Sequence, residues 1–174
     1  DMRLMGGLFS KMKITAITML FGCLAIAGIP IFSGFWSKDL VIDTAMLAFE
    51  NGVGDATVWF TLLWVLAVVT AFMTAFYMFR MFFLAFHGDA RSERVRGHRV
   101  KEDFFMTLPI VVLAIPSFLG GYVGKGFFEK FFRPGSLHTP QLIKLAELPW
   151  LPYLAVGIAL VAMFIAWVCY ASPK

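Results

Sequence analysis

The residues best suited to chemistry are a lysine and an aspartate that are adjacent in the chain, Lys38 and Asp39, with a second carboxylate at Asp43. They follow a run of 24 uncharged residues that starts at Ile14. Neighbouring residues on a helix point about 100° apart, so Lys38 and Asp39 need not pair directly. A lysine in apolar surroundings loses hydration of its ammonium group and becomes able to release and rebind a proton near neutral pH.

A break in the preceding segment is the second candidate feature. Gly28 and Pro30 interrupt the uncharged run, and Gly34 follows shortly after. Proline removes a backbone hydrogen bond and clashes with the preceding turn, and glycine adds conformational freedom. Two interpretations remain open: a simple proline kink, or a pair of half-helices of the kind that builds ion sites in transporters.

The depth of Lys38 depends on this break. A straight helix from Ile14 to Lys38 would rise about 36 Å, which would place the lysine at the far interface with its charged end in water. If residues 28–34 instead unwind sideways, Lys38 lies within the bilayer. Composition leaves both depths open.

The other candidates for a functional role are weaker. Arg80 is expected to extend its charge towards the cytoplasmic interface, and His87 is expected to be solvated. Cys23 and Cys169 lie in separate apolar runs without a Cys-x-x-Cys motif, so we expect no metal, cluster or disulfide. The chain has no phosphate-binding loop and no nucleic-acid-binding face, and we expect no cofactor bound to it.

These residues must be positioned by membrane helices. The chain of 174 residues is 60% hydrophobic and 15% charged, and its mean hydropathy is +0.80. A soluble globule of this size could not bury so much apolar surface. Uncharged runs of at least 20 residues suffice to cross a bilayer, where the backbone must be helical. The sequence therefore predicts an all-α, polytopic bundle within one transmembrane domain, with passes at 14–48 (broken near Gly28–Gly34), 56–86, 104–124 and 148–172.

The orientation of these passes follows from the basic residues. The net charge is +4, and five Lys or Arg residues lie between Gly88 and Asp103. Connections rich in Lys and Arg stay on the cytoplasmic side. We therefore expect the loop at residues 88–103 to be cytoplasmic. The chain starts at Asp1 and shows no signal peptide, so we expect a fragment of a longer protein.

The motifs together resemble a known family. They are Asp1-Met2-Arg3-Leu4-Met5-Gly6-Gly7-Leu8, Ala27-Gly28-Ile29-Pro30, Phe32-Ser33-Gly34-Phe35-Trp36-Ser37-Lys38-Asp39, Phe79-Arg80 and Phe86-His87-Gly88. The sequence resembles a later portion of subunit L of NADH-quinone oxidoreductase (respiratory complex I), an antiporter-like subunit related to Mrp sodium/proton antiporters. The likeness is strong over residues 1 to about 90, and beyond them it rests on hydropathy.

This resemblance implies a function. The first pass corresponds to the discontinuous helix of a half-channel, Lys38 inside the membrane is the proton-transfer residue, and Asp39 tunes its charge. Lysine at this position favours subunit L over its neighbour, subunit M, which has glutamate. Other complex I membrane subunits, subunit M in particular, are then partners in a bacterial inner membrane. NADH, FMN, iron–sulfur clusters and quinone are expected in partner subunits. The alternatives are a subunit of an Mrp-type antiporter or a membrane-bound hydrogenase, and, from another class, a structural membrane anchor.

Overall fold

The computed structural model describes residues 2–36, 38, 57–97, 102–131 and 150–171, and these residues contain helices and no strands. Two short 3₁₀ helices, η1 and η2, begin the chain. The α-helices follow, and a further short helical stretch at 33–36 and 38 lies between the first two of them. The bounds are Met2–Leu4 (η1), Leu8–Ser10 (η2), Lys13–Ala27 (α1), Thr57–Phe86 (α3), Glu93–Gly97 (α4), Phe104–Phe131 (α5) and Leu151–Tyr170 (α7).

The lengths of the apolar helices fit a membrane protein. Three of them contain stretches long and apolar enough to cross a bilayer, Thr61–Phe86, Phe104–Val123 and Tyr153–Tyr170, and α1 is a shorter apolar helix. This confirms the predicted all-α transmembrane bundle, in which the first helix is interrupted. The predicted residues 39–48 of the first pass lie outside the described residues. α5 continues past residue 124 to Phe131, because a helix can extend beyond the apolar run into the polar interface.

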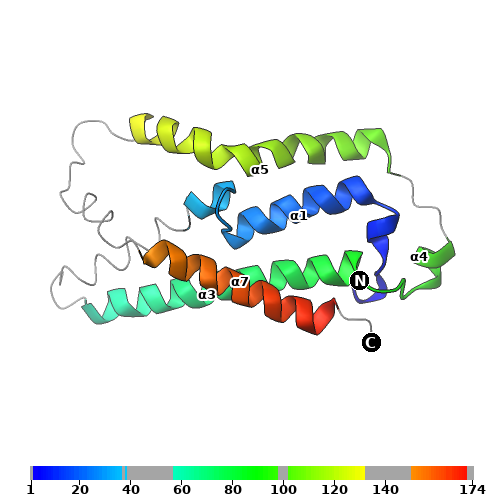
Figure 1. Ribbon diagram of the computed structural model, residues 1–174, viewed down its shortest axis with the longest axis horizontal. Helices are drawn as coiled ribbons and strands as arrows, with labels where there is room; N and C mark the ends of the chain where they lie inside the picture. The colour runs from blue at the N-terminus through cyan, green and yellow to red at the C-terminus, as the bar shows by residue number, and fades with distance from the viewer. Residues whose placement is uncertain (1, 37, 39–56, 98–101, 132–149, 172–174) are drawn as a thin grey trace.

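The helices alternate in direction, as Figure 1 shows. α1 and α5 run one way, and α3 and α7 run the other way. α1 contacts both α5 and α3, and α3 also packs along α7. The N-terminal segment, α4 and the end of α7 lie at one end of the bundle (Figure 1). This end, which we call the basic end, carries Lys11, Lys13, Arg91 and Arg96.

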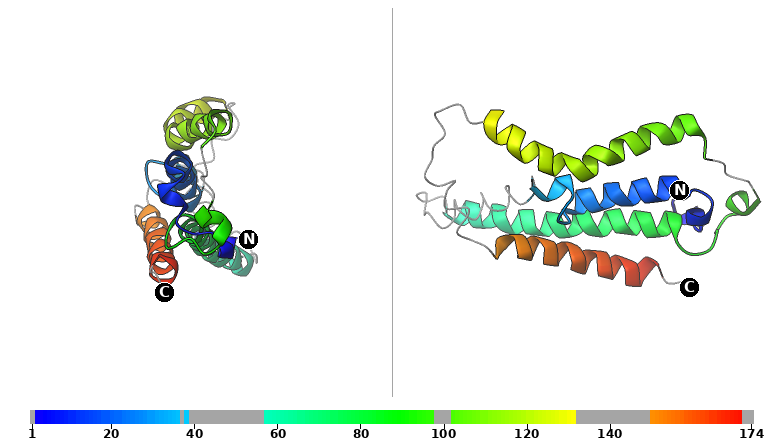
Figure 2. Two further views of the ribbon diagram at one scale, coloured as in Figure 1. Left: turned by 90° about the vertical axis from the view of Figure 1, so that its right-hand side faces the viewer. Right: turned by 45° about the horizontal axis from the view of Figure 1, so that its top comes forward.

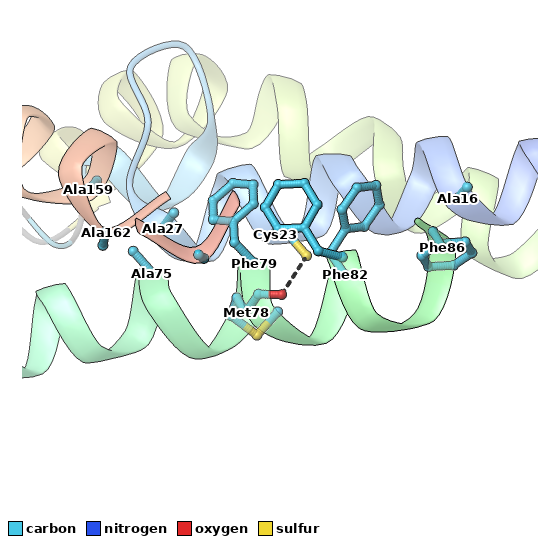
Figure 3. Packing of buried hydrophobic residues seen from close by; sticks show 12 residues of the cluster. Ala16, Cys23, Ala27, Ala75, Met78, Phe79, Phe82, Phe86, Ala159 and Ala162 are labelled. Carbon is cyan, nitrogen blue, oxygen red and sulfur yellow. Dashed lines mark hydrogen bonds between the residues drawn. The ribbon is translucent and has the colours of Figure 1, made fainter. Parts of the chain in front are cut away.

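Alanines and phenylalanines together fill the buried cluster shared by α1, α3 and α7. Ala27, Ala75 and Ala162 are almost completely buried in one apolar cluster, together with Cys23 (Figure 3). Small residues allow helix backbones to approach closely, which favours association in membranes through van der Waals packing. The thiol of Cys23 lies 3.8 Å from the carbonyl oxygen of Met78. Cys23 is buried between helices, and Cys169 is exposed on α7.

α5 is bent near its middle, as the right-hand view of Figure 2 shows. Pro109 and Pro116 both lie inside this helix. A proline in a helix interior removes a hydrogen bond and clashes with the preceding turn, so it commonly causes a kink. The bend brings the middle of α5 towards the end of α1.

Contacts at the basic end hold α1 in place. The amide N–H of Thr15, in the first turn of α1, donates to Oε1 of Glu102 at 2.9 Å. The ammonium of Lys11 donates to the carbonyls of Val95 and Arg96, which end α4. Free amides at a helix start favour a carboxylate, and free carbonyls at a helix end favour a cation. The connection between α3 and α5 is therefore tied to the start of α1.

Candidate functional site

The break after α1 is a helix-termination motif. Gly28 has φ of +81°, and its N–H donates to the carbonyl of Ala25 at 3.2 Å. The N–H of Ile29 donates to the carbonyl of Leu24, also at 3.2 Å. These two bonds form the Schellman motif, in which a glycine in the left-handed region closes the helix. The break is therefore a true helix end, and the interpretation as a simple kink is wrong.

The backbone beyond the break is strained. Ile31 has φ of +90°, which a β-branched residue rarely adopts. Such a conformation costs on the order of 1–3 kcal/mol and persists only where the surroundings impose it. Phe32 and Phe35 donate backbone hydrogen bonds to the carbonyls of Ile29 and Phe32, and residues 33–36 are helical again. The chain thus turns sharply and resumes as a helix.

The helical segment that follows the break, at residues 33–36 and 38, folds back against α1. We call it the resumed segment. A Cβ atom added to Gly34 would overlap the carbonyl of Ala25, so this backbone crossing requires glycine. The ammonium of Lys38 donates to the carbonyl oxygen of Ala27 at 3.4 Å. A continuous helix would place Lys38 about 16 Å beyond Ala27. Lys38 therefore lies beside the last turn of α1.

The position of Ala27 gives the depth of Lys38 within the bundle. Figure 3 shows Ala27 level with Ala75 and Ala162, which are central in α3 and α7. Because the ammonium of Lys38 contacts Ala27, it lies near the middle of these membrane-length helices. This position beside Ala27 favours the deeper of the two depths that the sequence left open.

Two features of the end of α1 favour a lysine side chain beside Ala27. The last carbonyls of α1 have no partner within the helix, and the end of a helix attracts a cation. The missing side chain of Gly28 leaves room for the aliphatic part of Lys38, whose Cδ would lie 3.2 Å from a Cβ at that position. The half-buried ammonium thus exchanges part of its water for a backbone carbonyl.

A pocket of about 380 Å³ adjoins the lysine. Its polar side chains are Lys38, Ser33 and Ser117, from the resumed segment and from α5. The rest of the lining is small or aliphatic and comes from Gly22, Ala25, Ile26 and Gly34. An amine that borders space for water beside two hydroxyl groups can exchange a proton with that water.

The glycines of α5 form the surface on which the resumed segment packs. A Cβ on Gly121 would overlap the indole of Trp36 and lie 3.1 Å from Cα of Ser33. Trp36 also packs on Tyr122, with ring centroids 6.1 Å apart, and Phe32 packs on Phe118 at 5.5 Å. These contacts hold the segment that carries Lys38 against α5.

Gly28 and Gly34 lie beside Lys38. The described candidates Arg80 and His87 make their contacts elsewhere. Asp39 and Asp43 lie outside the described residues. Arg80 is exposed, with its guanidinium 5.3 Å from the ring centroid of Tyr170, an arrangement that favours a cation–π interaction. His87 is half-buried, and its ring packs on Phe83 at a centroid distance of 5.2 Å. The rings of Phe9 and Phe82 also pack on it, so His87 is only partly open to solvent.

Sequence reasoning missed three parts of the site. Ser117 was one hydroxyl within an uncharged run, and Gly121 was read only as part of a membrane pass. The carbonyl of Ala27 becomes a partner only because the chain folds back. Ser117 and Gly121 lie close in sequence to Pro116, which could have drawn attention to them. Which segment of the chain packs against them could be known only from the folded structure.

Comparison with known proteins shows which membrane proteins this chain is similar to. Residues 1–74 match the membrane family described as NADH:quinone oxidoreductase/Mrp antiporter. The whole chain is 40% identical to NAD(P)H-quinone oxidoreductase chain 5 of Picosynechococcus sp. and covers 28% of that protein. It is 32% identical over its full length to the chloroplastic subunit 5 of Mesostigma viride, of which it covers 26%.

A bacterial relative carries the name expected from the motifs. NADH-quinone oxidoreductase subunit L of Campylobacter jejuni is 38% identical over 74% of this chain, which covers 20% of that subunit. The chain spans about a quarter of the length of these curated relatives. It is an integral membrane protein homologous to the antiporter-like subunits of NADH-quinone oxidoreductase, as its motifs predicted.

Proposed function

We propose that this chain is part of a proton-translocating membrane subunit of an NADH-quinone oxidoreductase, in which Lys38 carries the transferred proton. The observation that supports the role of Lys38 most directly is its hydrogen bond to the carbonyl of Ala27 at the broken helix. Ala27 itself belongs to the buried cluster that α1 shares with α3 and α7 (Figure 3). Ionisable groups at such a depth generally serve ion or proton pathways.

The chemistry of the proposed step needs only the groups around the pocket. The Lys38 ammonium transfers a proton to a water molecule and becomes a neutral amine, which later takes up another proton. The neutral amine still fits the pocket beside the hydroxyls of Ser33 and Ser117. Asp39, the next residue, tunes the charge of Lys38 and assists release, with Asp43 as a further carboxylate.

The rest of the machinery belongs to other chains under this proposal. NADH oxidation and quinone reduction take place in partner subunits, which hold FMN and the iron–sulfur clusters. This chain binds none of these groups. Neighbouring membrane subunits, in particular the antiporter-like subunit M, pack beside it in a bacterial cell membrane. Arg80 and His87 remain secondary candidates for the proton path.

A second function shares the same geometry. The matching family is described jointly for NADH:quinone oxidoreductase and Mrp antiporters, which favours a subunit of an Mrp-type sodium/proton antiporter as the alternative. Lys38 would have the same role there, coupled to a sodium gradient.

The test replaces the lysine in the full-length protein within its assembled complex. Lys38→Met cannot bind a proton, and Lys38→Arg stays protonated. We expect both to reduce quinone-linked proton pumping in membrane vesicles by at least about tenfold. Lys13→Met, at an exposed lysine at the start of α1, should pump normally. Normal pumping by both Lys38 variants at normal assembly would leave only the structural-anchor interpretation.

A further inference from the structure

Arg80 is a charged residue within a membrane-length helix. It lies in the apolar stretch Thr61–Phe86 of α3, six residues before the end of the helix and so about 9 Å from it. The side chain is exposed. A guanidinium stays protonated at any physiological pH, so it needs a polar partner wherever the membrane removes its water.

The contacts of Arg80 within this chain leave that need unmet. Its guanidinium lies 5.3 Å from the ring centroid of Tyr170, at the end of α7. Throughout the residues that the structure describes, Arg80 donates no side-chain hydrogen bond and pairs with no carboxylate. A cation–π contact supplies no hydrogen-bond acceptor, so the fork of N–H donors is available to a further ligand.

The ring of Tyr170 holds the guanidinium in place. Tyr170 is half-buried and packs on Phe76, with ring centroids 6.1 Å apart. An aromatic face held in this way restricts the arginine side chain beside it, which reduces the entropy lost when a ligand binds. The guanidinium therefore lies at the junction of α3 and α7, at the level where α7 ends.

This level corresponds to the headgroup region of the bilayer. α7 ends at Tyr170, and Trp167 is exposed one turn before that end. Tyrosine and tryptophan are enriched where the membrane meets water. The end of α7 lies at the basic end of the bundle (Figure 1), which its lysines and arginines predict to be cytoplasmic. The cytoplasmic leaflet attracts basic residues because it contains anionic lipids.

The surfaces beside Arg80 suit lipid chains better than another helix. The small residues of α7 are buried in the cluster shared with α3: Ala159, Ala162 and Ala166. The exposed side chains of α7 are mostly large: Leu160, Val161, Phe164, Ile165, Trp167 and Val168. The exposed side chains of α3 that precede Arg80 include Val69, Met73 and Tyr77. Helices associate in membranes through small residues, so these large side chains favour acyl chains as neighbours.

We infer that Arg80 and Tyr170 form a binding site for the phosphate group of an anionic phospholipid in the cytoplasmic leaflet. The N–H groups of the guanidinium donate to two phosphate oxygens, a geometry that arginine provides and lysine does not. Tyr170 orients the guanidinium, and the acyl chains lie along the exposed residues of α7. This inference does not rest on the proposed role of Lys38.

Photochemical cross-linking identifies the neighbours of this site. The photoreactive residue p-benzoylphenylalanine replaces Trp167 in the full-length protein within its assembled complex, in vesicles of equal parts phosphatidylglycerol and phosphatidylcholine. Mass spectrometry then quantifies the two lipid adducts. We expect phosphatidylglycerol adducts to exceed phosphatidylcholine adducts at least about fivefold, the preference that one basic residue confers for an anionic lipid. The same replacement at Trp59, exposed at the opposite end of α3, should give equal amounts.

Two pairs of variants assign the preference to this site. Arg80→Gln removes the charge and should bring the adduct ratio to about one. Lys13→Gln removes a charge elsewhere at the basic end and should leave the ratio unchanged. Tyr170→Leu keeps the charge but removes the ring, and should lower the ratio at least about twofold. Tyr170→Phe keeps the ring and should retain the ratio, so this pair decides the matter if Arg80→Gln does not assemble.

Three outcomes would overturn the site. The first is equal labelling of the two lipids at Trp167. The second is an adduct ratio that neither Arg80→Gln nor Tyr170→Leu changes. The third is cross-linking of Trp167 to protein in place of lipid, because another membrane segment would then cover Arg80.

Discussion

The indole ring of Trp36 rests on the backbone of Gly121, at a place where no side chain larger than hydrogen fits. This contact joins the segment that carries Lys38 to α5, where the helix is bent (Figure 2). The two glycines at this point are not equivalent. A Cβ on Gly120 would meet Cβ of Ser33 at 3.5 Å, an ordinary contact.

The first prediction follows from that difference. Gly121→Ala should destabilise the protein by about 1–3 kcal/mol, because overpacking forces the indole or the backbone of Ser33 to move. Gly120→Ala should be neutral or slightly stabilising, since alanine favours the helix. Thermal unfolding of the detergent-solubilised full-length protein measures both. Equal unfolding midpoints for the two variants would contradict the close contact between Gly121 and Trp36.

The second prediction concerns the helix end at Gly28. Gly28→Ala should cost about 1–2 kcal/mol, because an L-residue is disfavoured in the left-handed region and its Cβ presses on the Lys38 side chain. Gly157→Ala, in a helix with open space around it, is the matched control and should gain up to about 0.5–1 kcal/mol. The same unfolding measurement applies. A stabilising Gly28→Ala would mean that α1 continues without a break.

The third prediction concerns Glu102 at the start of α1. Glu102→Ala removes the acceptor of the Thr15 N–H and should destabilise the protein by about 0.5–2 kcal/mol. Glu102→Gln keeps an acceptor oxygen but loses the charge, so the loss should be only about 0.3–1 kcal/mol. The order of the three unfolding midpoints is the readout. Identical midpoints for wild type and Glu102→Ala would show that the carboxylate does not cap α1.

The fourth prediction fixes the orientation in the membrane. Gly97→Cys places a thiol in open space at the exposed end of α4, within the loop rich in arginine. In the Cys169→Ser background it should react with an impermeant reagent only from the cytoplasmic side, because basic loops stay there. Labelling from the outside of intact cells would invert the topology of every helix.

Much of the fold could be predicted because the bilayer restricts the possibilities. Uncharged runs had to be helices, and their existence followed from the positions of charged residues alone. The break at Gly28 was also visible, since glycine and proline disfavour a continuous helix. Both inferences needed only local sequence.

The geometry of the site could not be predicted in the same way. The side on which the chain resumes is decided by where Gly34 meets Ala25 and where Gly121 receives Trp36. Trp36 and Gly121 are distant in sequence, the meeting of Gly34 with Ala25 requires the chain to reverse, and the pattern of apolar residues is uniform around each helix. The place of Lys38 beside Ala27 therefore depends on tertiary packing, as does the partial burial of His87 among Phe9, Phe82 and Phe83.

α1 is held at its start by the hydrogen bond from Thr15 to Glu102, and Gly34 crosses it closely at Ala25 near its end. Movement of α1 along its axis would break this hydrogen bond and disturb this crossing. Any displacement of Lys38 relative to α1 must therefore be absorbed by torsions between Ile29 and Gly34. The strained Ile31 lies within this interval. Rotation about the backbone of this short segment would therefore move Lys38 while α1 stays in place.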